Sequence, residues 1–349
     1  MSLNNTFDNL LATARNEQDD PKRSNVINGA ADAKPRMELF HAGLSMCSNK
    51  VRVVLAEKGV SYMSHELSIL AQKGIYSETF TPAENYRPGY VRLRMHAADI
   101  QGLMEHLAQE HTLRTAVNTE GFDACVVPLL IDNEKHKGVV DSLEIMKYID
   151  SEIPAPIKLI PENPVQAEAV MRQVTIVDGT PHPGILYAFH ENDPRPDFIK
   201  HTMEDVYDVK VGALNQLIDQ NKNDEALVRA YKAKISKELA GKKIYRDAQF
   251  TAGIIREFEG LIADLDAQLA QPDDEWICGS DFTLADAVWG VSLFRIHWLG
   301  HAYLWDNYPR VRDYAYRCYK RPSIRNAVID WPSPMPESPH TADVLGATA

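Results

Sequence analysis

The chain has 349 residues, of which 44% are hydrophobic and 25% are charged. This length suggests two domains, or one domain with large additions, and it suffices to bury a core without disulfides or metals. The net charge of -12, from 37 basic and 49 acidic residues, argues against nucleic acid or an anionic membrane as the main partner, because phosphate binding needs a clustered basic excess.

Other sequence features indicate in which cellular compartment the protein is expected. No run of 18 apolar residues predicts a membrane span, and the N-terminus lacks the apolar segment of a secretory signal. The cysteines are scattered and form no CxxC pair, at positions 47, 125, 278 and 318. We therefore expect no metal site and no small disulfide framework, and a reducing cytoplasm is the simplest location.

Residues 1–35 are rich in Asn, Asp, Ala and Lys and have little apolar content. We expect a flexible arm that lies over the rest of the chain or over a partner. Within this arm, one or two helical turns are predicted by the spacing of four apolar residues, Phe7, Leu10, Leu11 and Ala14.

From Arg36 the pattern becomes that of a strand, a helix and a second strand. Met37–Phe40 is predicted to be a strand, and a helix over Met46–Lys58 follows and ends at Gly59. Apolar and polar residues then alternate over 63–69, which predicts the second strand. Such a β-α-β unit makes its two strands parallel, with a right-handed crossover.

Cys47 lies at the start of this predicted helix. The Ser45 hydroxyl can accept a bond from a first-turn N–H, and this cap places Cys47 where free N–H groups and the helix dipole favour negative charge. A thiolate is the nucleophilic form of sulfur, so Cys47 is a candidate nucleophile. The same place could stabilise the thiolate of a bound small thiol. The alternative is that Cys47 is a small buried apolar residue, and the spacing alone does not separate these interpretations.

Residues 70–120 form a long insert after the second strand. A helix is predicted around Asp99–Gln109 within it. Upstream, Tyr86 and Tyr90 stand among arginines beside a Pro-Gly pair. They line a substrate cleft or, as is commoner for such a cluster, only hold a surface loop in place.

The segment 126–131 predicts a strand that contains Pro128. Proline is unfavourable within a sheet, so Pro128 is either a cis-proline that turns the preceding backbone toward a ligand or an ordinary edge-strand proline. Residues 132–138 predict a hairpin turn into Val139 and Val140.

Asp141 and Ser142 precede a helix predicted over 143–151. They form either an anion site, together with the N–H groups behind them, or a plain N-cap. The order β-α-β, spacer, β-β-α over Arg36–Glu152 is the thioredoxin-like arrangement.

Prolines at 154, 156, 161 and 164 predict a linker. Beyond it the chain is predicted to be helical over 165–178, 198–221, 225–239, 251–269, 283–299, 309–319 and 322–329. Thr283 and Asp286 have the spacing of a capping box, which we interpret as structural. The proline-containing tail, 332–349, is expected to be extended.

The chain resembles the glutathione transferases from Arg36 to about Trp331. The resemblance rests on Cys47-Ser48, Val127-Pro128, Asp141-Ser142, the proline linker and the block from Gly279 to Asp286. It implies an α/β fold joined to an all-α one. A flexible arm (1–35) would precede a thioredoxin-like glutathione-binding domain (36–152, with insert 70–120), and an all-helical substrate domain (160–331) would precede the extended tail.

The resemblance also implies a site for glutathione, the co-substrate of this family. Val127, before the presumed cis bond to Pro128, would pair with the glutathione backbone, and Asp141 with Ser142 would hold the γ-glutamyl carboxylate. Cys47 or Ser48 would activate or replace the glutathione thiol, with Ser45 and Asn49 beside them. Further pocket residues are guesses from the same resemblance: Tyr86, Tyr90, Arg92, His182 and Trp298.

Within the family, residues 45–52 and 84–93 are similar to those of glutathione-dependent reductive dehalogenases of chlorinated hydroquinones. Residues 121–123, 178–182 and 291–300 resemble the dichlorohydroquinone type. The related bacterial β-aryl etherases cleave aromatic ethers, and some are heterodimers. Partners implied are thus glutathione, a small aromatic substrate, and a second subunit in a homodimer or heterodimer, with no nucleic acid and no membrane.

Three classes of function follow from this resemblance. The first is a glutathione-dependent enzyme acting on an aromatic substrate, as a dehalogenase or alternatively as an etherase. The second is a thiol-disulfide reductase that uses Cys47. The third is a non-catalytic subunit that binds glutathione. A cysteine at position 47 favours thiol-disulfide chemistry without specifying a halogenated substrate.

Overall fold

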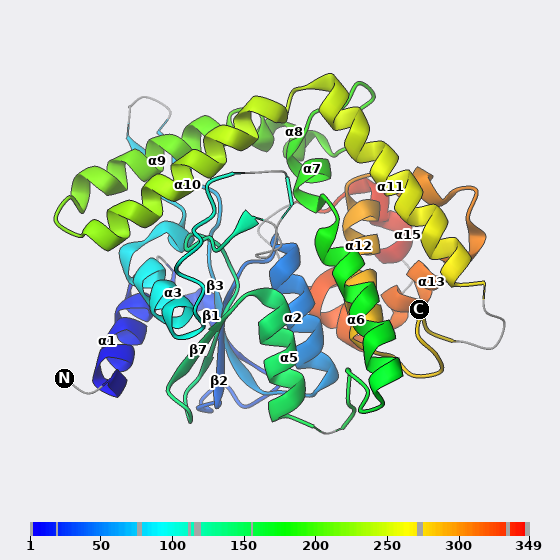
Figure 1. Cartoon of the computed structure of the whole chain (residues 1–349), viewed down its shortest axis with the longest axis horizontal. Coiled ribbons are helices and arrows are strands. Elements are labelled where there is room, and N and C mark those ends of the chain that lie inside the picture. The colour runs from blue at the N-terminus through cyan, green and yellow to red at the C-terminus, as the bar shows by residue number, and fades with distance from the viewer. Residues whose placement is uncertain are drawn as a thin grey trace.

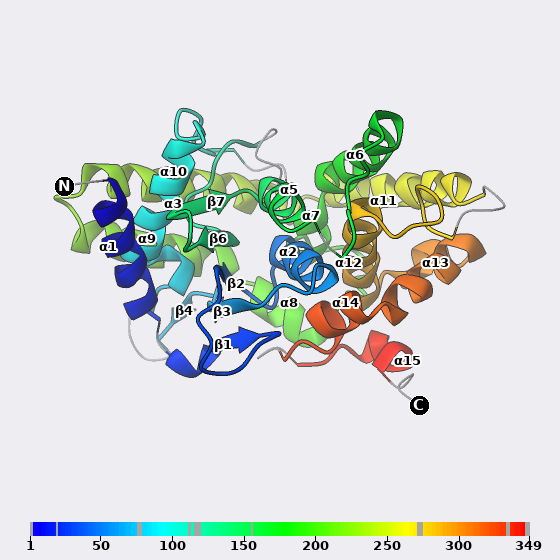
Figure 2. The ribbon, with the colours of Figure 1, turned by 90° about the horizontal axis from the view of Figure 1, so that it is seen from below.

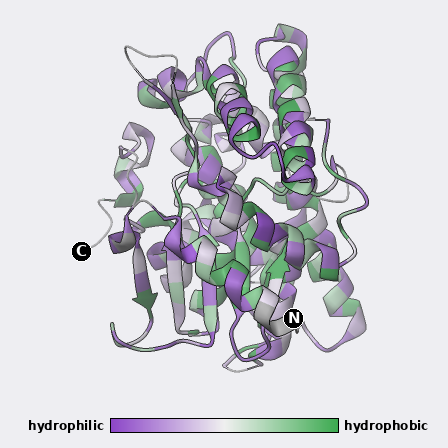
Figure 3. Cartoon of the chain, turned by 90° about the vertical axis from the view of Figure 1, so that its left-hand side faces the viewer, coloured by the Kyte–Doolittle hydropathy of each residue, from purple (hydrophilic) through white to green (hydrophobic). Residues whose placement is uncertain are grey.

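The computed structural model describes residues 3–18, 20–74, 79–110, 113–114, 120–154, 156–270, 275–332 and 336–345. A five-stranded sheet with helices on both faces forms the N-terminal part, and helices alone form the C-terminal part (Figure 1). Helices near the surface show alternating hydrophilic and hydrophobic patches, as expected for helices with one buried face (Figure 3).

The main sheet has the order β1-β3-β2-β6-β7. Only β2 and β3 are parallel, and each other neighbouring pair is antiparallel. The strands are β1 (Ser24–Ile27), β2 (Met37–His41), β3 (Tyr62–Glu66), β6 (Leu129–Asp132) and β7 (Lys137–Val140). This topology confirms the predicted β-α-β unit, the hairpin and the thioredoxin-like arrangement. A two-stranded ribbon is formed by β4 (Gln72–Lys73) and β5 (Phe80–Thr81).

Strand β2 contributes side chains to two cores, because successive residues of a strand face opposite sides. Leu39 packs in the core shared with α2 (Met46–Glu57) and α5 (Ser142–Glu152), which continues into the helical part. Phe40 packs in the core shared with α1 (Leu3–Asn16) and α3 (Pro88–Ile100). Seen from below, the two helix pairs lie on opposite sides of the sheet (Figure 2).

The described residues of the N-terminal arm form a helix and a strand, whereas the sequence predicts a flexible segment. Phe7, Leu11 and Ala14 lie on one face of α1 and are buried against α3. Arg15 reinforces this packing through an ion pair with Glu38 of β2. After a short helix, η1 (Pro21–Arg23), β1 pairs along β3. The few apolar residues of the arm lie on one face of α1, and this face is enough to hold the arm against α3.

The prediction of a helix around Asp99–Gln109 is wrong. The helix of this region, α3, begins earlier, with Pro88 at its first position, where the missing proline N–H costs nothing. It ends at Ile100, just before Gly102, which has a φ of 73°. A short helix, η2 (Glu84–Tyr86), precedes it.

The C-terminal part is helical, as the sequence predicts, but two predicted helices are divided and two short helices are added. The predicted helix over 198–221 is interrupted at Glu204 and Asp205, and that over 322–329 is divided at Arg325. The added helices begin at His182 and at Ala302. The elements are α6 (Pro164–Gly179), α7 (His182–Tyr187), α8 (Asp197–Met203), α9 (Val206–Gln220), α10 (Glu225–Ile244), α11 (Ala248–Gln268), α12 (Leu284–Trp298), η3 (Ala302–Trp305), α13 (Pro309–Lys320), α14 (Pro322–Ile324) and η4 (Arg325–Ile329).

Helix α12 is the centre of this part, since nearly all its residues are buried. It packs against α6, α13 and α2, and so joins the helices to the sheet domain. The predicted capping box at its start is confirmed. Asp286 accepts hydrogen bonds from the backbone N–H groups of Ile277 and Thr283, at 3.0 and 2.8 Å, and from the hydroxyls of Thr283 and Tyr314, at 2.9 and 2.7 Å.

The tail folds back instead of extending. Its described residues include η5 (Pro339–Thr341) and α15 (Ala342–Leu345). The Ser338 hydroxyl donates to the carbonyl of Trp298 at 2.6 Å, and Arg325 donates to the carbonyl of Val344 at 2.8 Å. None of the helices within the described residues has the length and apolar character needed to cross a bilayer.

Candidate active site

The N-terminus of α2 has the predicted cap. The Ser45 hydroxyl accepts a hydrogen bond from the Ser48 N–H at 3.2 Å, and its backbone is extended, as an N-cap requires. Cys47 is therefore the second residue of the helix, and it is partly exposed. No disulfide involves any of the four cysteines, all of which lie in described parts of the chain.

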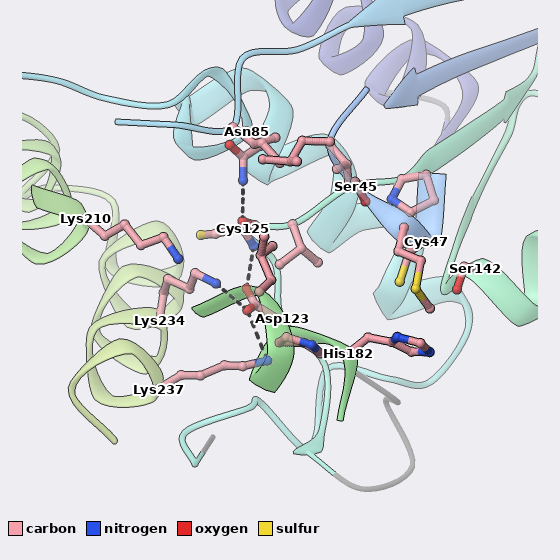
Figure 4. Close-up of a pocket in the computed structure, with 18 of the residues that line it drawn as sticks. Ser45, Cys47, Asn85, Asp123, Cys125, Ser142, His182, Lys210, Lys234 and Lys237 are labelled. Carbon is pink, nitrogen blue, oxygen red and sulfur yellow. Dashed lines mark hydrogen bonds and ion pairs between the residues drawn. The ribbon is translucent and has the colours of Figure 1, made fainter. Parts of the chain in front are cut away.

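Cys47 faces a cavity of about 200 Å³ between the sheet domain and the helices. Figure 4 shows Ser45, Cys47 and Ser142 on one side of this cavity and three lysines on the other. Eight of the residues proposed from the sequence line it: Ser45, Cys47, Tyr86, Val127, Pro128, Asp141, Ser142 and His182.

Asp141 and Ser142 reach the cavity at the start of α5. The Asp141 carboxylate accepts hydrogen bonds from the N–H groups of Leu143 and Glu144, at 2.9 and 3.2 Å, and so caps the helix. Its φ of 72° is unfavourable for a residue with a side chain, and such backbone strain clusters at functional sites. Burial raises the pKa of Asp141.

The loop that leads into β6 forms another wall of the cavity, and its Val127–Pro128 peptide bond is cis. Side chains of the 84–94 region hold this loop by its carbonyl groups. Asn85 donates to Cys125 O at 2.6 Å, Tyr90 donates to Val126 O at 2.7 Å, and Arg94 donates to Pro128 O. The predicted Tyr-Arg cluster therefore supports the cavity wall instead of a surface loop.

Five other residues proposed from the sequence do not line this cavity. The Ser48 hydroxyl points inward and accepts from Ala42 N–H at 3.3 Å, and the Tyr90 hydroxyl is used in the loop. Arg92 pairs with Asp224 at 2.8 Å on the outer side of α3. A second cavity of about 430 Å³, between α12 and the C-terminal segment, is lined by the remaining two, Asn49 and Trp298.

Buried cations surround the start of α2. Lys50 is 1% exposed and pairs with Asp178 of α6. Burial opposes its charge, but Asp178 and Cys47 outweigh burial and raise the pKa of Lys50. Arg52 is also buried and lies over the Trp331 ring, 4.2 Å from its centre. The side chains of Lys50 and Arg52 are thus both buried, although two charged residues near a helix start are typical of a solvated helix face.

Arg295 of α12 lies where the two cavities meet and lines both of them. It donates to the carbonyl of Leu44, in the loop just before α2, and lies over Trp298, 5.6 Å from the ring centre. Burial, only partly offset by Tyr187 and Cys47, lowers the pKa of Arg295 to about 10. Among the described residues, no carboxylate lies within ion-pair distance of it.

The far wall of the cavity carries a buried charge cluster that the sequence interpretation missed. Lys234 pairs with Asp123 at 2.8 Å and with Glu238 at 2.8 Å, and Lys210 pairs with Glu238 at 3.1 Å. Lys237 pairs with Glu120 at 2.9 Å. Lys234, Lys237 and Glu238 recur three and four residues apart on α10, and this helix-face spacing was the available signal.

His182 of α7 lies in the cavity lining, 5% exposed. Its Nε2 is 3.0 Å from the Ser292 hydroxyl, and among the described residues its Nδ1 has no hydrogen-bond partner. Burial, with help from Lys50 and Arg295, lowers the pKa of His182 well below its usual value, so the ring is neutral at neutral pH. Across the described residues, no three His, Cys, Asp or Glu side chains are grouped to hold a metal ion.

The chain is similar to known proteins in sequence and in fold. Residues 247–315 match the family model of the glutathione S-transferase C-terminal domain. A 2,5-dichlorohydroquinone reductive dechlorinase of Sphingobium indicum is 36% identical, over 91% of this chain and 89% of that protein. A tetrachloro-p-hydroquinone reductive dehalogenase of Sphingobium chlorophenolicum is 24% identical, over 84% and 96% of the two chains.

Among solved structures, the β-etherase LigF from Sphingobium sp. strain SYK-6 aligns with a TM-score of 0.50 and 15% identity, over 84% of this chain and 98% of that one. This likeness concerns the fold alone. The identity to the dechlorinase extends over nearly the whole chain and includes both the sheet domain and the helices. The chain therefore belongs to the glutathione S-transferase family.

Proposed function

We propose that this protein is a glutathione-dependent enzyme that displaces a leaving group from an aromatic substrate, as a reductive dehalogenase of a chlorinated hydroquinone. One observation carries the proposal. Cys47 stands in the capped first turn of α2, open to the cavity, in a chain 36% identical to a 2,5-dichlorohydroquinone reductive dechlorinase. A partly exposed cysteine at a helix N-terminus is the kind that reacts as a thiolate.

Glutathione would bind along the wall formed by the loop before β6 and the start of α5. The backbone of Val127 would pair with that of the tripeptide, and the Ser142 hydroxyl, at the positive end of the α5 dipole, would receive its γ-glutamyl carboxylate. Both residues line the cavity that contains Cys47, which supports this placement. Ser45 would lie near the glutathione sulfur. Asn49, also predicted at this site, instead accepts a hydrogen bond from Arg52 at 2.8 Å.

The proposed chemistry uses two molecules of glutathione. The first thiolate attacks the ring carbon that bears chlorine, and chloride leaves with the bonding electrons. The Cys47 thiolate then attacks the sulfur of this adduct. The carbon–sulfur bond breaks, the carbon keeps the electron pair and takes a proton, and Cys47 is left in a mixed disulfide. A second glutathione thiolate releases Cys47 and leaves as oxidised glutathione.

The test is an assay of the purified protein with glutathione and 2,5-dichlorohydroquinone. We expect chloride and the dechlorinated hydroquinone. The variant Cys47→Ser should still release the first chloride but stop there, so that mass spectrometry finds the glutathionyl hydroquinone. Cys278→Ser is the matched control, because Cys278 is also partly exposed but does not line the cavity, and it should behave as the wild type.

Other outcomes would contradict the proposal. Release of a phenol from a β-aryl ether, with no chloride from the hydroquinone, would make the protein an etherase. Reduction of a glutathione mixed disulfide alone would make it a thiol-disulfide reductase. Glutathione binding without any turnover would make it a binding subunit. The cytoplasmic location and the homodimer or heterodimer stay predictions, which cell fractionation and sedimentation would test.

A further inference from the structure

The titratable side chains near Cys47 come from five elements, and they differ in whether a group of opposite charge offsets them. Lys50 of α2 is paired with Asp178 of α6, so these two largely cancel. Asp141, at the start of α5, carries a negative charge when ionised, and His182 of α7 is neutral. Arg295 of α12 is a cation for which the structure, over the residues it describes, shows no carboxylate partner.

Arg295 differs from the other buried cations of the cavity. The lysines of the far wall, Lys210, Lys234 and Lys237, each have a carboxylate partner within 3.1 Å. Arg295 is 6% exposed, and its hydrogen bond goes to a backbone carbonyl, that of Leu44. A buried cation without an anionic partner is costly, and an anion that arrives in reach of it is strongly favoured.

The position of Arg295 identifies where that anion would be. Its bond to Leu44 fixes the guanidinium beside the loop that carries the α2 cap, three residues before Cys47. Both Arg295 and Cys47 line the same cavity. The planar guanidinium has five N–H donors, and the bond to Leu44 uses one of them. No other acceptor for this guanidinium is found among the described residues, so its remaining donors can face an anion at the start of α2.

We propose that Arg295 is the counter-cation of the reacting sulfur, and holds the thiolate charge at the start of α2 through the steps that form and break the mixed disulfide. Every step proposed for the enzyme has a sulfur anion either attacking or leaving at this place. The helix N-terminus supplies only partial charges, whereas Arg295 supplies a full one. This inference rests on the proposed function but is tested without substrate.

The experiment measures alkylation of Cys47 in a Cys278→Ser background, so that the other partly exposed thiol is absent. Burial raises the pKa of Cys125 and of Cys318, and both are buried, so they should not compete. Rates are followed with iodoacetamide, which is neutral, and with iodoacetate, which is an anion. A cation beside the sulfur lowers the pH at which alkylation becomes fast, and it favours the anionic reagent.

For Arg295→Gln we expect the rate of alkylation by iodoacetamide at pH 7 to fall about tenfold. In addition, the ratio of the iodoacetate rate to the iodoacetamide rate should itself fall about threefold. Arg295→Lys keeps the charge and should recover most of both effects. Arg246→Gln is the matched control. Arg246 also donates to a backbone carbonyl and lies over an aromatic ring, but it does not line the cavity, so both rates should stay unchanged.

Circular dichroism and thermal melting would show whether the variants are folded. If Arg295→Gln does not fold, two tests remain. One is Arg295→Lys, which should alkylate much as the wild type does. The other is the wild-type ratio of iodoacetate to iodoacetamide rates, which should depend only weakly on salt, because a buried cation is screened less than a surface one. Unchanged rates in folded Arg295→Gln would overturn the inference. If these rates change but the wild type releases no chloride, the inference stands and the proposed function fails.

Discussion

Tyr90→Phe removes a single oxygen atom from beneath the cavity wall. The Tyr90 ring is buried, and its hydroxyl donates to the Val126 carbonyl at 2.7 Å, next to the Val127–Pro128 bond. Burial raises the pKa of Tyr90 to about 12, so the donor proton is present at every working pH. Phenylalanine fills the same space and leaves the carbonyl without this donor.

The cost follows from the lost hydrogen bond. A neutral bond contributes about 1 kcal/mol, and a partly buried carbonyl left without a donor raises this to roughly 1–2 kcal/mol. For a protein of this size the melting temperature should fall by about 1–3 °C. If half of this lost free energy also weakens the binding of glutathione to the Val127 backbone, glutathione should bind about twofold to fivefold more weakly, since ~1.4 kcal/mol is tenfold in affinity.

Differential scanning calorimetry and titration with glutathione measure the two effects. Tyr319→Phe is the matched control, because Tyr319 is equally buried but its hydroxyl has no partner among the described residues. That variant should melt at or above the wild-type temperature and bind glutathione normally. If Tyr90→Phe melts and binds as Tyr319→Phe does, the loop does not depend on this hydrogen bond and the reasoning is refuted.

Two further predictions concern stability. Asp286→Ala removes the acceptor of four buried hydrogen bonds and should lower the free energy of unfolding by about 3–5 kcal/mol, whereas Asp281→Ala, at an exposed position nearby, should have almost no effect in urea titrations. Burial opposes the charge of Glu38, but bonds from His65 and Arg15 outweigh it and lower its pKa from 4.5 to about 2. The ionised Glu38 therefore contributes roughly 3 kcal/mol to the free energy of unfolding above pH 5, and this contribution is lost as the pH falls toward 2, so the difference in stability between wild type and Glu38→Gln should shrink over this range. A constant difference from pH 6 to pH 3 would contradict the second prediction.

Local patterns predicted most of the fold and the positions, at helix starts, of several residues that line the cavity beside Cys47. Ser45, Cys47, Asp141 and Ser142 stand at helix starts, and a helix start is fixed by a few neighbouring residues. The hairpin after Pro128 and the capping box at Asp286 are equally local. These features need no knowledge of distant contacts, so the sequence alone sufficed for them.

The far wall of the cavity depends on contacts that no local pattern specifies. Asp123 meets Lys234 across 111 positions, and Arg295 meets Leu44 across 251. Lys50 looks like a surface residue in its own helix, and only Asp178 of α6 makes its burial possible. The same reason explains the error over the N-terminal arm, whose few apolar residues become a docking face only when α3 is present.

Strand β1 covers an edge of β3 that would otherwise be open. It pairs with β3 from Ser24 to Ile27 and takes the outermost place in the sheet. Without it, the backbone amides and carbonyls along that side of β3 would be open to a strand from any neighbouring copy, which is how edge-to-edge aggregation begins. A shortened protein that starts at residue 36 would keep every residue of the proposed site, but it would exchange the short β1 for β3 as the open edge of the sheet, and we expect it to aggregate more readily.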